Sequence, residues 1–207
     1  VLRNGSAAFR FKGNEDRGGI VEHIRVRNMG IDSFDRLFWF QLNYPGELGG
    51  GYPPIYRDIL FENITADNVD TVFEAHVLNS QSLQDVLLKN IEVKNSNTPF
   101  IMENVQDLKF DNVLINNNPI VGAAANIKDL VQHYEETGDL SQQGSHSLKI
   151  HLTAVSQFEE KGLTEMVVKH VKGFKKLLVY QMDNQLISEK AFKALNANGD
   201  FLIEKYE

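Results

Sequence analysis

The feature that most constrains this chain is a motif that occurs four times within the first 115 residues. The copies cover residues 21–31, 56–66, 83–93 and 105–115. Each copy carries an asparagine at the same place: Asn28, Asn63, Asn90 and Asn112. Four residues earlier, each copy carries an apolar residue: Ile24, Ile59, Val86 and Leu108. Self-similarity of this kind predicts a solenoid, in which every copy forms part of one coil stacked on the next.

The spacing inside each copy indicates short strands. Apolar and polar residues alternate before the asparagine, as in a half-buried strand, and the phase shifts after it, as at a bend. The copies are offset by 35, 27 and 22 residues, so the longer coils carry loops, such as the Gly- and Pro-rich residues 44–54. Stacked asparagines can bond one another through their amides. These features predict a right-handed parallel β-helix over residues 1–120. A leucine-rich repeat is the competing solenoid, but its helical segment and leucine spacing are missing.

The pattern changes after Pro119. Residues Ile127, Leu130, Val131 and Tyr134 form the stripe of an amphipathic helix, and three further stripes follow. Four residues are placed to open the helices: Asn126, Ser141, Thr164 and Ser188. We therefore expect a mixed two-domain chain, with a linker at residues 121–125 and a four-helix bundle over residues 126–207.

Composition excludes several classes of function. The formal charge is −7, from 21 basic and 28 acidic residues, and no cluster of Lys and Arg appears, so no nucleic-acid partner is expected. The apolar runs are too short to span a bilayer, so no membrane partner is expected. The chain has no cysteine, which rules out disulfides and thiolate chemistry. Any chemistry must rest on Asp, Glu, His, Arg, Lys, Tyr or the backbone.

Arg10 and Lys12 are the first candidate binding residues. They flank Phe11 in a short alternating strand, so their side chains lie on the same face. A guanidinium and an ammonium side by side suit a carboxylate ligand. The alternative is a pair of solvated charges on an edge strand.

The Arg10-Phe11-Lys12 strand, the Arg17-Gly18-Gly19 turn and the continuation at residues 20–29 resemble the C-terminal half of glycoside hydrolase family 28, the polygalacturonase family. The resemblance implies hydrolysis of α-1,4-galacturonosidic bonds in pectin, with inversion. It implies that Arg10 and Lys12 bind the carboxylate of galacturonic acid and that Tyr44 lies near the sugar. Phe11 replaces the isoleucine of the family motif, which should affect packing more than chemistry.

The catalytic part of the family pattern is missing. The Asn-Thr-Asp, Asp-Asp and Gly-His-Gly motifs of the family do not occur, and an inverting hydrolase needs a carboxylic acid and a carboxylate base. We therefore expect no catalytic residue in this chain, which would be an inactive C-terminal fragment of a longer enzyme. The chain starts with Val1 and shows no signal-peptide pattern, in keeping with a piece of a longer protein. The end around Phe9, Phe11 and Ile20 should pair with the missing N-terminal part or self-associate.

The helical half resembles the FIMAH domain, a module at the C-termini of secreted hydrolases of Gram-positive bacteria. The matching segments are residues 127–141, 167–174, 187–195 and 201–206. The resemblance implies a secreted, extracellular bacterial parent and no catalytic role for the helices. The competing interpretation of the whole chain is a non-catalytic β-helix surface or adhesion protein with a helical interaction module.

No metal or other cofactor is expected. Residues 196–207 space oxygen side chains as a calcium loop does, but Phe201 stands where that loop needs glycine. The six histidines are scattered without a zinc spacing. Glu74 and His76 share one face of a strand and are interpreted as surface residues.

Overall fold

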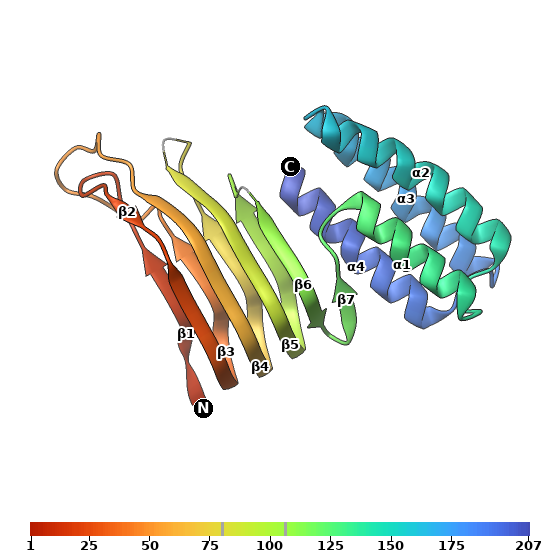
Figure 1. Cartoon of the computed structure of the whole chain (residues 1–207), viewed down its shortest axis with the longest axis horizontal. Coiled ribbons are helices and arrows are strands. Elements are labelled where there is room, and N and C mark those ends of the chain that lie inside the picture. The colour runs from red at the N-terminus through yellow and green to blue at the C-terminus, as the bar shows by residue number, and fades with distance from the viewer. Residues whose placement is uncertain (80, 106) are drawn as a thin grey trace. The chain divides into compact units, whose positions relative to one another are not determined.

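The computed structural model describes residues 1–79, 81–105 and 107–207, which form two compact units, Val1–Asn117 and Asn118–Glu207. A mostly parallel sheet of seven strands precedes four helices (Figure 1). None of the helices in the described ranges is long and apolar enough to cross a membrane. We describe each unit separately.

Strands β1 to β6 make up the N-terminal unit. Their bounds are Leu2–Lys12 for β1, Ile20–Val21 for β2, Ile24–Gln41 for β3, Ile55–His76 for β4, Ser82–Glu103 for β5 and Leu108–Ile115 for β6. The strands lie side by side in the order β1-β3-β4-β5-β6, and β2 pairs with β4 (Figure 1). Every pairing among them is parallel.

The register of the sheet follows the sequence repeat. Ile24 lies opposite Ile59, Ile59 opposite Val86, and Val86 opposite Leu108, so equivalent positions of the four copies form one row. The insertions between copies are accommodated between strands, as at residues 42–54 between β3 and β4. Loops can absorb such length differences because neighbouring coils need only keep their register in the strands.

The asparagines bend the strands and bond one another. Asn28, Asn63, Asn90 and Asn112 all have a left-handed backbone, with φ between 51° and 59°. The amide of Asn63 donates to Asn28 at 3.0 Å, that of Asn90 to Asn63 at 3.0 Å, and that of Asn112 to Asn90 at 2.9 Å. We call this row the asparagine ladder.

A second row of left-handed residues went unpredicted. It lies five residues before the asparagine ladder and consists of His23, Asp58, Asp85 and Asp107, with φ between 52° and 59°. Each copy of the motif therefore contains a short straight segment between two bends. The recurring Asp-x4-Asn spacing in the last three copies was the available sequence signal.

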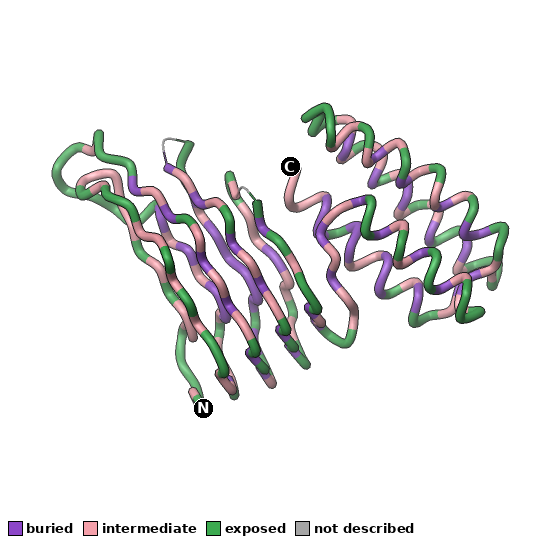
Figure 2. The backbone as a smooth tube through the Cα atoms, in the orientation of Figure 1, coloured by how far each residue is buried: buried purple, intermediate pink, exposed green. Residues whose placement is uncertain are grey.

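Phenylalanines form a further row beyond the asparagine ladder. A register row joins Phe9, Phe38, Phe73 and Phe100 on four successive strands. Phe11 stacks on Phe40 with ring centroids 4.6 Å apart and planes 7° apart. Buried positions recur along the long strands (Figure 2). The side chains of neighbouring strands thus form one continuous apolar row.

The C-terminal unit begins with β7 (Asn118–Ile120) and contains α1 (Ala124–Glu136), α2 (Gln142–Glu160), α3 (Thr164–Asp183) and α4 (Glu189–Tyr206). Each helix packs on the next, and α4 also packs on α1, so the four surround one core. Predicted stripe residues such as Val131, Leu152, Phe174 and Leu195 are buried.

Two of the four predicted helix starts are capped as expected. Ser141 accepts a hydrogen bond from the backbone N–H of Gly144 at 3.1 Å, and Ser188 accepts one from Ala191 at 3.2 Å. Helix α3 begins at Thr164 without a side-chain cap.

The predicted cap at Asn126 is wrong. Helix α1 begins at Ala124, two residues earlier, so residues 124 and 125 of the expected linker are helical. The N–H of Ala124 donates to the carboxylate of Glu159 at 3.0 Å, and the Asn126 amide donates to the carbonyl of Val121 at 2.9 Å. The helix starts early because a carboxylate distant in sequence satisfies its first free N–H.

Candidate functional site

Arg10 and Lys12 lie at the end of β1, both exposed and on the same face of the strand. Arg10 is in register with Trp39 and Lys12 with Gln41. The Arg10 guanidinium lies over the Trp39 ring, with its carbon 3.9 Å from the ring centroid, and donates a hydrogen bond to the Gln41 side chain. Contact with the indole face holds the guanidinium in place while part of it stays open to solvent.

Lys12 contacts Tyr44, the third predicted site residue. The ammonium nitrogen lies 4.1 Å from the centroid of the Tyr44 ring, and the backbone N–H of Tyr44 donates to the carbonyl of Gly13 at 3.1 Å. Tyr44 is 40% exposed. The structure therefore brings Lys12 and Tyr44 together and places Arg10 two residues away on the same face.

The loop that carries Tyr44 is held by Asp16. The Asp16 carboxylate accepts hydrogen bonds from the backbone N–H groups of Leu48 at 3.0 Å, Gly50 at 2.9 Å and Glu47 at 2.5 Å. These three donors, those of Leu48 and Gly50 above all, lower the pKa of Asp16. A side chain at Gly46 would come within 2.2 Å of this carboxylate, so the close approach requires glycine there.

A cavity of about 550 Å³ lies between these loops and is lined by Lys12, Arg17, Tyr44 and Tyr56 among others. Tyr56 is buried and donates a hydrogen bond to the carbonyl of Lys12 at 2.7 Å, and burial raises the pKa of Tyr56. The lining brings two cations and two tyrosine rings together with two carboxylates, Asp16 and Glu47, of which Asp16 is engaged by the backbone of the Tyr44 loop. Where Lys12 lies against Tyr44, a cation beside an aromatic ring suits an anionic ligand with an apolar ring face.

The site face continues over the next strands. Arg36 also lies over the Trp39 ring, at 4.4 Å, and donates to Glu74 at 2.6 Å. Glu74, interpreted as a surface residue, is only 5% exposed and contacts His76 at 3.1 Å. His76 in turn contacts Glu103 at 3.0 Å. We call Arg10, Lys12, Trp39 and Tyr44 the cationic face. It borders the row of charged contacts that runs from Arg36 to Glu103.

Sequence reasoning missed Trp39 and Asp16. The repeat recognised in the sequence covers only the segments around the asparagine ladder, whereas Trp39 lies near the end of β3, beyond the repeated segment. The row of Phe9, Phe38, Phe73 and Phe100 was the signal that would have aligned Trp39 with Arg10.

The described residues contain no group of three or more His, Asp and Glu that could hold a metal ion. Residues 196–207, whose oxygen side chains are spaced as in a calcium loop, lie mostly in α4. Asn198 is fully buried there, and its side chain bonds the backbone. Its side-chain oxygen accepts from the N–H of Val121 at 2.9 Å, and its amide donates to the carbonyl of Pro119 at 2.7 Å.

Comparison with known families identifies the helical module. Residues 124–204 match the family model of the FIMAH domain. This match covers α1, α2 and α3 in full and most of α4. No curated protein and no solved structure matches the chain.

Proposed function

We propose that this chain is the C-terminal part of a secreted bacterial glycoside hydrolase that acts on pectin, and that its cationic face binds galacturonate. The observation that carries the proposal is the placement of Arg10 and Lys12 on one face, each against an aromatic ring. Galacturonic acid combines a carboxylate with an apolar sugar face, so a cation beside an aromatic ring complements it. The FIMAH match supports the secreted parent, given the resemblance described above.

As part of this proposal, residues 1–120 form a right-handed parallel β-helix. Its support is the parallel pairing at constant register, with two bends per coil. The chain returns to the same register position on the next strand after 22 to 35 residues. A solenoid makes this return within each coil, whereas an open parallel sheet needs crossover connections, usually helices.

Isothermal titration with oligogalacturonates tests the cationic face. We expect the double variant Arg10→Ala/Lys12→Ala to lose at least tenfold in affinity, since charge-assisted hydrogen bonds contribute about 1.5–3 kcal/mol. Tyr44→Ala should lose less. Arg3→Ala, which removes an exposed charge from the same strand, is the matched control and should bind normally. Equal affinity of the double variant and Arg3→Ala would contradict the proposal.

Activity separates the fragment hypothesis from a complete enzyme. The 207-residue chain should release no reducing ends from polygalacturonate, because the acid and base motifs are missing. Measurable release would show that the chain contains its own catalytic residues. Absence of both activity and galacturonate binding would favour the competing surface or adhesion protein.

We further propose that β1 pairs with another strand, from an N-terminal part of the same protein or from a second copy. Within the described residues β1 pairs only with β3, and Phe9 and Phe11 are half-buried at the end of the aromatic stack. Ile20 is 54% exposed nearby. Sedimentation of the chain at high concentration should reveal association, and a strict monomer would count against it.

A further inference from the structure

A second groove lies on the N-terminal unit, away from the cationic face. Its volume is about 560 Å³, and it shares no lining residue with the cavity at Lys12 and Tyr44. It crosses β1, β3, β4 and β5 at a single register, where Asn4, Ser33, Asn68 and Asn95 form one row. Three strand spacings of about 4.8 Å give the row a length of about 14 Å, enough for a short run of linked sugar rings.

Short polar side chains line the groove in fixed positions. The Asn95 amide donates to the side-chain oxygen of Asn68 at 3.2 Å, and the Asn97 amide donates to Asp70 at 2.7 Å. The Asn95 amide also donates to the carbonyl of Asp67 at 3.1 Å, so both of its N–H donors are used within the protein. A side-chain amide oxygen has two acceptor sites, so the oxygen of Asn68 can accept a second hydrogen bond beside the one from Asn95. Amide oxygens held in fixed positions can accept hydrogen bonds from the neighbouring hydroxyls of a sugar.

Phe34 supplies an apolar ring among these polar groups. The ring is partly exposed and lies against Gly5 of β1, where a side chain would come within 2.9 Å of the Phe34 ring. Because Gly5 has none, the ring can lie over the neighbouring strand. Pockets that orient a small ligand commonly combine an aromatic face with a few fixed polar groups.

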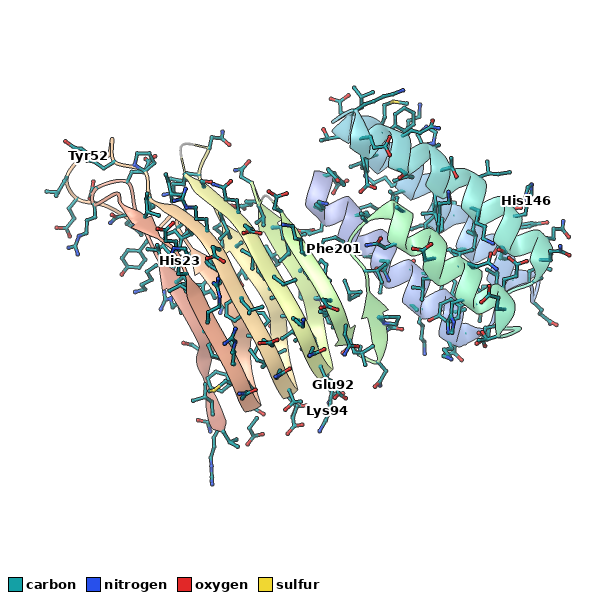
Figure 3. All side chains as sticks on the ribbon, in the orientation of Figure 1. His23, Tyr52, Glu92, Lys94, His146 and Phe201 are labelled. Atoms are coloured by element: carbon teal, nitrogen blue, oxygen red, sulfur yellow. The ribbon has the colours of Figure 1, made fainter. Side chains whose placement is uncertain are left out.

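The charge of the groove is opposite to that of the cationic face. Asp35 and Asp70 contribute carboxylates, and no basic residue is among its lining residues in the described part of the chain. Lys94, labelled in Figure 3 and next to Asn95 in sequence, has its ammonium 2.6 Å from Asp67. A polyanion would meet like charges here, and like charges facing one another oppose binding.

We propose that this groove binds a neutral polysaccharide chain, laid across the strands with a sugar ring on Phe34 and hydroxyls on Asn68 and Asn95. The site is independent of galacturonate binding at the cationic face. It would hold the protein on the neutral glycans of a polysaccharide matrix.

Affinity electrophoresis of the full chain in gels that contain galactan, arabinan, xyloglucan or polygalacturonate tests the groove. At least one neutral polymer should retard the protein. Phe34→Ala should weaken that retardation at least tenfold, and Phe34→Leu, which keeps apolar volume but loses the flat ring, should weaken it similarly. Asn68→Ala changes an exposed side chain and should cost threefold or more without affecting folding.

Arg10→Ala is the matched control, because it should leave retardation by neutral polymers unchanged and affect polygalacturonate alone. The proposal is overturned if no neutral polymer retards the chain. It is equally overturned if the Phe34 and Asn68 variants migrate like the unmodified protein, or if polygalacturonate is the polymer lost on their substitution. Failure of galacturonate binding at Arg10 would leave the result in the neutral gels standing.

Discussion

At the scale of single residues, the asparagine ladder combines two properties that few side chains share. A left-handed backbone costs an ordinary L-residue about 1–2 kcal/mol, and asparagine tolerates it better than most. The same side chain then donates to one neighbour and accepts from the next, as Asn63 does with Asn28 and Asn90. The repeat is therefore visible in the sequence because both the bend and the ladder require asparagine.

We expect Asn63→Ala to lower the free energy of unfolding by about 1–3 kcal/mol, from the strained backbone and two lost hydrogen bonds. Asn63→Gly keeps the bend and loses only the bonds, so it should cost less. Denaturation by urea measures both. Asn112→Ala loses the bond to Asn90, and a larger loss for Asn112→Ala than for Asn63→Ala would contradict this account.

Asp16 makes the order of the Tyr44 loop depend on pH. The pKa of Asp16 is lowered below its usual 3.8 by hydrogen bonds from Leu48, Gly50 and Glu47. A lowered pKa in the folded state means that the stabilising effect is complete above the unfolded value and is lost as pH falls through the folded value. The amide NMR signals of these three residues should therefore shift together below about pH 4.

The Asp16→Asn variant should show the altered amide signals already at neutral pH and no further transition on acidification. Asp32→Asn, at an exposed position of β3, is the control and should leave the transition in place. An unchanged transition in Asp16→Asn would assign it to another group.

At the scale of secondary structure, caps fix where two of the helices start. Ser188→Ala should lower the stability of the helical unit by about 1 kcal/mol, because the N–H of Ala191 loses its acceptor. Thermal unfolding followed by circular dichroism measures the loss. Ser147→Ala is the comparison within α2, where the hydroxyl donates to the carbonyl of Gln143 and caps nothing. Equal losses in the two variants would show that capping is not the cause.

Strand register and helix faces were predictable because the groups that determine them are close in sequence or repeat. Val131 and Leu195 follow from the helical period, and the pairing of Ile24 with Ile59 follows from the asparagine that succeeds each. The start of α1 was not predictable, since its acceptor, Glu159, lies 35 residues away.

The site was predictable only in part, for the same reason. Spacing alone places Arg10 and Lys12 on one face of a strand. The contact of Arg10 with Trp39 depends on a register offset of 29 residues, which no asparagine marks. The Asp16 carboxylate accepts hydrogen bonds from the backbone of residues 47–50, which form a loop of irregular structure. Sequence periodicity carries no information about such a loop.

At the scale of the whole molecule, the two compact units each have a core, and such units commonly fold alone. We expect residues 118–207 to form a helical domain that unfolds in one cooperative transition, measured by calorimetry. A broad transition without a heat peak would show that the helices need the rest of the chain.

Asn198→Ala tests what holds the first segment of that unit in place. The loss of the bonds to Val121 and Pro119 at a buried position should cost about 2–4 kcal/mol. Asn196→Ala, which removes a hydrogen bond to Asp200 within α4, should cost much less. Similar costs, measured from the thermal transition of the helical unit, would contradict a special role for Asn198.

The asparagine ladder also has a direction. Each amide donates toward the strand that precedes it in sequence, so one end of the row presents an N–H donor at Asn28 and the other an acceptor at Asn112. Two like ends cannot continue such a row, since both would offer the same kind of group. A contact that extends the ladder itself is therefore head to tail, and head-to-tail contacts between copies lead to open-ended assemblies rather than to a closed two-fold dimer.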